Sequence, residues 1–77
     1  MPPEEPSSEL LTLAMQISPS AGNTKPQSLI MKDIQKAAAL IRPRDPIAAA
    51  TIESLAIENL ANNRGEIAKR IITTLNS

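Results

Sequence analysis

The chain has 77 residues, no cysteine, no histidine and no aromatic side chain, and its eight basic and eight acidic residues give a formal net charge of zero. This composition excludes disulfides and thiolate or imidazole metal sites, and it removes most nucleophiles and general bases that enzymes use. We therefore expect a non-catalytic protein without a cofactor or a bound metal. The balanced charge also argues against broad attraction to nucleic acid or to a membrane.

The aliphatic content is high, with eight leucines, ten isoleucines and three methionines, whereas valine is absent. Seventy-seven residues form one domain at most, and so small a domain is marginally stable unless a disulfide, a metal or a partner reinforces it. Alanine, leucine, glutamate and lysine are abundant, and all four favour helices. We expect an all-α fold, a small bundle of three to four short helices within residues 8–77, preceded by an arm at 1–7.

The N-terminal arm, 1–7, is rich in proline and glutamate and is predicted to be disordered or extended. It has neither the basic start nor the apolar stretch of a secretory signal, so we expect a cytoplasmic protein. A first helix is predicted over 8–18, and the Ser-Pro-Ser-Ala-Gly-Asn segment that begins at Ser18 ends it. Its apolar residues recur at i, i+3, i+4 and i+7: Leu10, Leu13, Ala14 and Ile17.

A second helix is predicted over 24–41. Thr24, Pro26 and Gln27 have the spacing of a capping box with proline in the first turn. The helix has one apolar seam, formed by Ile30, Ile34, Ala37 and Ile41. Its basic residues either contact phosphate or an acidic partner, or pair with glutamates of the next helix, and we favour the second alternative.

A third helix is predicted over 45–62, because Asp45 and Pro46 together form a strong helix start. Two alternatives exist for the chain that follows residue 62. Either one helix continues from 46 to about 75, or the chain bends near Gly65 and Asn63 caps a fourth helix over 64–75. Apolar residues before and after Gly65 are out of phase by a quarter turn or more at about 100° per residue, which favours the bend.

A bend at Gly65 suggests an alternative function. Ala61, Gly65 and Ile71 have the spacing that holds two helices together in a helix-turn-helix, a DNA-binding motif. Arg64 and Glu66, however, occupy positions where that motif requires apolar residues, so an ordinary helix corner is favoured. The alternative is a small DNA-binding regulator. Its nucleic-acid contacts would be Arg64, Lys69 and Arg70.

The aliphatic residues are too many for one small core. Ile47, Ile57, Ile72, Leu11 and Leu40 lie off the main apolar stripes and cannot all face inward together. Exposed apolar surfaces mark interaction sites. We therefore expect a protein-protein interaction or assembly module that forms a homodimer or docks on a larger protein, for instance as an inhibitor, and that does not bind a membrane. The predicted interface residues are Ile47, Ile57, Leu60, Ile67, Ile72 and Leu75.

Overall fold

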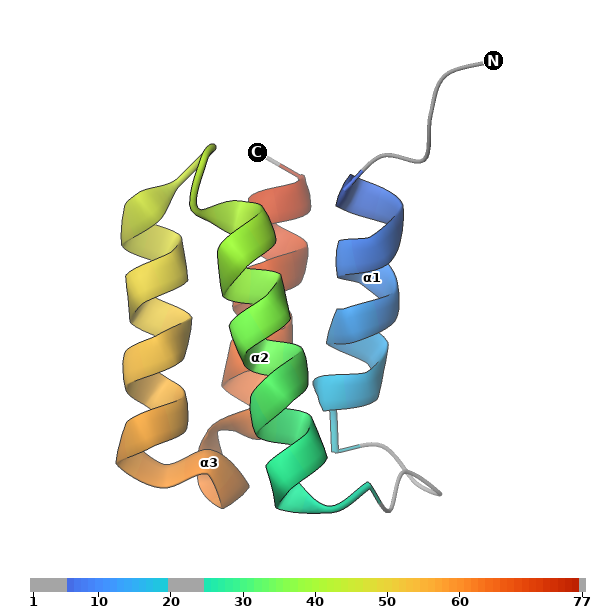
Figure 1. The fold of residues 1–77 in the computed structure, drawn as a ribbon, viewed down its shortest axis with the longest axis vertical. Helices are drawn as coiled ribbons and strands as arrows, with labels where there is room; N and C mark the ends of the chain where they lie inside the picture. The colour runs from blue at the N-terminus through green and yellow to red at the C-terminus, as the bar shows by residue number, and fades with distance from the viewer. Residues whose placement is uncertain (1–5, 20–24, 77) are drawn as a thin grey trace.

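The computed structural model describes residues 6–19 and 25–76, and within these ranges the chain forms three helices, α1 (Pro6–Ile17), α2 (Gln27–Ile41) and α3 (Pro46–Leu75). The prediction of an all-α fold is confirmed. α3 is interrupted at Asn59, whose backbone angles (φ −166°, ψ 84°) are not helical. We call residues 46–58 the first limb of α3 and residues 60–75 its second limb. Successive helical segments run in alternating directions, so the chain folds as an up-and-down bundle (Figure 1).

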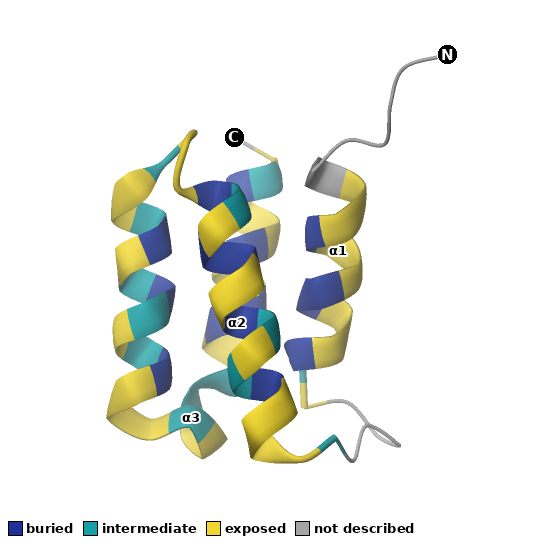
Figure 2. Cartoon of the chain, viewed as in Figure 1, coloured by how far each residue is buried: buried dark blue, intermediate teal, exposed yellow. Residues whose placement is uncertain are grey.

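The second limb lies at the centre of the fold. It runs behind α2, while the first limb and α1 lie on opposite sides of this central pair (Figure 1). Each of the three helices packs against the other two. The first limb and α1 therefore form the two flanks of the bundle, and each turns an exposed side outward (Figure 2).

The helix starts differ in how closely they follow the prediction. Asp45 caps α3 as expected, because its Oδ1 accepts a hydrogen bond of 3.1 Å from the Ala48 N–H and Pro46 takes the first helical position. α2 begins at Gln27, three residues later than predicted. Pro26 occupies its N-cap position and no side chain caps it; Thr24 lies outside the described residues.

α1 begins at Pro6, within the segment predicted as the arm, and ends at Ile17. The rest of that arm, 1–5, and the predicted break at 20–23 lie outside the described residues. Ser18 follows the helix in a bend, and its N–H donates to the Ala14 carbonyl at 3.0 Å. The predicted extent of 8–18 for this helix is therefore correct within about two residues at each end, which is ordinary for helix boundaries.

The bend predicted at Gly65 is wrong in position, because Gly65 lies inside the second limb and the break is at Asn59. Asn59 caps the second limb, with its Oδ1 accepting from the Asn62 N–H at 3.3 Å. Asn63 does not cap a helix start. Its Nδ2 donates to the Leu55 carbonyl at 2.8 Å, which satisfies an acceptor at the end of the first limb. Two asparagine side chains thus stabilise the corner.

The apolar core takes residues from all four helical segments. The predicted seams of α1 and α2 are confirmed, since each of their members is buried. The second limb departs from prediction at Ile67, which was expected at an interface but faces inward with Ala68, Ile71 and Thr74; Ile72 is exposed, as expected. The Thr74 hydroxyl donates to the Arg70 carbonyl at 2.9 Å, so its burial leaves no unpaired donor. The buried apolar residues are Leu10, Leu13, Ala14, Ile17, Ile30, Ile34, Ala37, Ala38, Ile41, Ala49, Ile52, Ala56, Ile67, Ala68 and Ile71.

Candidate interaction surfaces

The first limb carries an exposed row of residues on the side opposite the core. Ile47, Ala50, Ser54 and Ile57 are all exposed, and we call this row the outer seam. At 100° per residue they cover an arc of about 80°. Ile47 and Ile57 keep 77% and 80% of their surface exposed, the largest fractions among the large apolar residues. The outer seam therefore places a large aliphatic side chain at each end and two small residues between them.

Polar and charged residues flank the outer seam. Thr51 and Glu58 border it on one side, and the Thr51 hydroxyl donates to the Ile47 carbonyl at 2.8 Å. A shallow hollow of about 440 Å³ runs along this side and reaches from Pro46 to Glu58. Arg44 precedes the limb in the exposed turn after α2. On the opposite border Glu53 forms an ion pair with Arg42 at 2.8 Å.

A second apolar surface lies between α1 and the second limb. Small residues, together with Met15 and Ile72, line a groove of about 520 Å³. Met15 is 65% exposed and Ile72 is 40% exposed. We call this surface the α1–α3 groove. Its residues are Ala14, Met15, Ser18, Gly65, Ala68, Lys69, Ile72 and Thr73.

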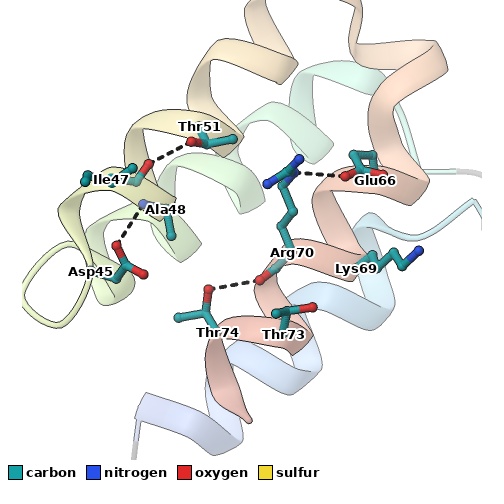
Figure 3. A pocket seen from close by; sticks show the side chains of 9 residues that line it. All are labelled: Asp45, Ile47, Ala48, Thr51, Glu66, Lys69, Arg70, Thr73 and Thr74. Carbon is teal, nitrogen blue, oxygen red and sulfur yellow. Dashed lines mark hydrogen bonds and ion pairs between the residues drawn. The ribbon is translucent and has the colours of Figure 1, made fainter. Parts of the chain in front are cut away.

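A third hollow, of about 400 Å³, lies between the two limbs of α3 and is more polar (Figure 3). Three of its four charged residues, Asp45, Glu66 and Arg70, are already engaged, whereas Lys69 is exposed. Arg70 leans toward Glu66 and binds it at 2.9 Å, and Asp45 accepts the capping hydrogen bond from Ala48 (Figure 3). Thr51 and Thr74 donate to backbone carbonyls of their own helices. This hollow therefore offers a ligand few groups that are not bound within the chain.

The structure separates the six predicted interface residues. Ile47 and Ile57 lie on the outer seam, and Ile72 lies at the α1–α3 groove. Leu60 and Leu75 are partly buried and pack against the core. Ile67 is a correction, because it is fully buried and cannot reach a partner.

Sequence reasoning did not find Met15, Ala50 and Ser54 as surface candidates. Met15 directly follows the buried Ala14 in α1, but it is largely exposed. Ala50 and Ser54 are small residues with no apolar signal of their own. The spacing of 3, 4 and 3 residues that joins Ile47, Ala50, Ser54 and Ile57 was the available signal.

The basic residues of the DNA-binding alternative have separate environments. Arg64 is half-buried, and its guanidinium donates to the carbonyls of Ile17 and Ser18 at 2.8 and 3.3 Å. It thereby satisfies acceptors at the C-terminal end of α1. Arg70 pairs with Glu66, and Lys69 is exposed. With the corner at Asn59 rather than Gly65, the geometry that suggested a helix-turn-helix is lost.

Among the described residues, the expected pairing with a glutamate of the next helix occurs at Arg42, which binds Glu53; the other pairs of the basic residues in and around α2 have different partners. Lys25 binds Asp33 at 2.6 Å and also contacts Gln16 of α1. Lys36 lies 3.8 Å from Glu9. The Lys36–Glu9 pair is exposed and contributes little stability, since exposed salt bridges are worth up to about 1 kcal/mol, whereas the Lys25–Asp33 pair is partly buried. They do lower the net positive charge that α2 presents to solvent.

Neither a metal-binding cluster nor a membrane span occurs within the described ranges, 6–19 and 25–76. No cluster of three or more acidic residues there has a geometry that could hold a metal ion. No helix in these ranges is both long and apolar enough to cross a bilayer. The exposed aliphatic surfaces are the features of the described residues that still require a functional explanation.

Comparison with protein-family models, curated proteins and solved structures finds no significant match. The function of this protein is therefore inferred from the geometry of the chain itself.

Proposed function

We propose that this protein is a non-catalytic assembly module that forms a homodimer through aliphatic side chains of α3. The observation that carries this proposal is the orientation of the first limb. Its exposed side bears Ile47 and Ile57, whereas Ala49 and Ala56 occupy two of the three buried positions on its core side, with Ile52 as the third. A helix that serves one core places its large apolar residues inward.

The free energy of burial supports a partner at this surface. An isoleucine side chain that is fully buried gains about 1.5–3 kcal/mol relative to one in water. Ile47 and Ile57 realise little of this gain in a single chain, because about four fifths of each side chain remains exposed. A symmetric dimer would bury Ile47 and Ile57 of both copies. Association would therefore add stability to a domain whose small size makes it marginal.

Sedimentation equilibrium tests the proposal on the full chain. Between about 10 µM and 1 mM we expect the mass to rise from one chain toward two, because association is driven by concentration. The melting temperature, followed by far-ultraviolet circular dichroism, should rise over the same range. A mass of one chain at every concentration, with a constant melting temperature, would reject the proposal.

A pair of matched variants locates the association to α3. Ile57→Ser should weaken dimerisation by about tenfold or more, since two buried isoleucines are lost in each dimer. Met15→Ser removes another largely exposed apolar side chain, from the α1–α3 groove, and should leave the dissociation constant unchanged. If Met15→Ser weakens the dimer and Ile57→Ser does not, the groove rather than α3's first limb carries the association.

A further inference from the structure

We infer that two copies of the chain pair their first limbs in antiparallel orientation, with the outer seams in contact and Ile47 packed against Ile57 of the partner subunit. This inference rests on the proposed homodimer and specifies its geometry. The other exposed apolar surface, the α1–α3 groove, has no comparable feature that identifies an occupant. The outer seam has a feature that identifies its occupant, because its sequence is complementary to itself.

The spacing of the outer seam is that of a short coiled coil. Ile47, Ala50, Ser54 and Ile57 are separated by 3, 4 and 3 residues, which corresponds to a, d, a and d positions over two heptads. All four are exposed, so no other part of the chain covers this seam in the described residues. A 3-4 seam packs against another helix at a crossing angle of about 20°.

The order of large and small residues selects the antiparallel orientation. The seam is symmetric about Ile52, since Ile47 and Ile57 lie five residues on either side and Ala50 and Ser54 lie two. In an antiparallel pair each a position faces a d position, so Ile47 meets Ile57 and Ala50 meets Ser54 of the partner subunit. The small residues let the helices approach closely at the centre while the isoleucines fill the ends. Such a contact is isologous, as a twofold dimer requires.

Charges at the two ends of the first limb favour the same orientation. Arg44 lies in the turn before the limb and Glu58 is its last residue, eight and six residues from Ile52. No salt bridge to either residue occurs within 6–19 and 25–76, the part of the chain described here. An antiparallel pair brings Arg44 toward Glu58 of the partner subunit, and does so twice. A parallel pair would leave Arg44 and Glu58 at opposite ends of the interface, so neither ion pair could form.

The border of the seam opposite Glu58 is compatible with this arrangement. Glu53 lies there close to the twofold axis, so the two copies bring their Glu53 side chains near each other. Each is already paired with Arg42 of its own chain at 2.8 Å, which offsets the repulsion.

The first limb is about 20 Å long, and one helix pair of that length buries less than a standard interface. We therefore expect a weak dimer, with a Kd on the order of 0.1 mM.

Engineered cysteines test the orientation directly, because the native chain contains no thiol. Facing Cα atoms of closely packed helices lie about 4–5 Å apart, within disulfide range. In an antiparallel pair Ala50→Cys faces Ser54→Cys, whereas two Ala50→Cys residues are about 7–8 Å apart. We therefore mix the Ala50→Cys and Ser54→Cys full-length variants in a glutathione redox buffer and identify the disulfide products by mass spectrometry. Ala39→Cys, at an exposed position of α2, measures chance collision.

The antiparallel dimer predicts that the mixed Ala50→Cys/Ser54→Cys product exceeds either symmetric product by at least about fivefold, since only the mixed pair meets disulfide geometry. Dominance of the two symmetric products would indicate parallel helices and overturn the inference. The inference would also be overturned if the cysteines of the outer seam formed no more disulfide than Ala39→Cys while the protein still sedimented as a dimer. In that case another surface carries the association. A protein that remains monomeric rejects the proposed function itself.

Charge reversal supplies an independent test. Arg44→Glu or Glu58→Arg alone should raise the Kd about 5- to 10-fold, because two ion pairs become two repulsive contacts. The double variant should return the Kd to within about twofold of the native value. Both changes suit the helix dipole, with glutamate near the start of the limb and arginine near its end, so the fold is retained. Additive weakening in the double variant would overturn the inference.

Discussion

The two limbs of α3 have similar lengths but distribute their apolar residues in opposite ways. The second limb buries Ile67 and Ile71 in the core and exposes a mostly polar side that includes Lys69 and Arg70. The first limb buries two alanines and Ile52 and exposes Ile47 and Ile57. Because both belong to one continuous segment, the difference reflects position in the bundle. The second limb lies behind α2 and between the two flanks, whereas the first limb is itself a flank (Figure 1).

Buried and exposed isoleucines of one helix therefore have different physical roles. Those of the second limb contribute to the free energy of unfolding of a single chain, because their neighbours belong to the same chain. Those of the first limb contribute to that free energy only when a partner covers them. Substitutions that separate these two contributions test the comparison directly.

The largest expected effect comes from truncation in the second limb. Ile71→Ala should lower the free energy of unfolding by about 2–5 kcal/mol, since it leaves a cavity in the core. Ile57→Ala in the first limb should change it by less than about 0.5 kcal/mol at a protein concentration well below the dimer Kd. Urea titrations followed by far-ultraviolet circular dichroism measure both, as the chain has no aromatic fluorophore. Equal losses would remove the distinction between the limbs.

An intermediate effect should follow loss of the contact between the second limb and α1. Arg64→Ala removes the hydrogen bonds to the carbonyls of Ile17 and Ser18, and hydrogen bonds from charged donors are worth about 1.5–3 kcal/mol each. Arg64 is half-buried, so we expect a net loss of about 2 kcal/mol. Lys32→Ala, at an exposed position of α2, is the control and should change stability little. Equal stability of the two variants would show that Arg64 does not anchor α1.

The smallest effects concern the corner that separates the limbs. Asn59→Ala removes the cap of the second limb and should cost about 1 kcal/mol. Gly65→Ala should stabilise the chain by up to about 1 kcal/mol, because Gly65 is helical and an added Cβ meets only Pro19, at 3.9 Å. Thermal unfolding compares the two variants with the native chain. Stabilisation by Asn59→Ala together with destabilisation by Gly65→Ala would place the corner at Gly65 instead.

Much of the fold followed from regular spacing. The seams of α1 and α2 repeat over several turns without a competing pattern, and every member is buried. The start of α3 was equally clear, because Asp45 and Pro46 combine two independent signals. The corner was not predictable to the residue. Asn59, Asn62 and Asn63 have similar capping preferences, and local sequence does not rank them.

The candidate surface was predicted in part. Ile47, Ile57, Ile72 and Leu11 were expected to exceed the capacity of the core, and all four are exposed, whereas Leu40 is partly buried. Ile67 was misplaced because the corner was placed six residues too late. The small residues of the outer seam could not be assigned to a surface until the opposite side of the first limb was known to face the core.

Local spacing and composition were enough to predict a helical protein and the core residues of α1 and α2, and they exclude histidine, cysteine and aromatic side chains from its chemistry. The position of the bend in α3, and which isoleucines of its two limbs face inward, depended on how the helices pack together. The physical reason is the helical period. Each residue rotates the side-chain direction by about 100°, so the phase of a limb is fixed only by the corner that begins it and the neighbours that it packs against.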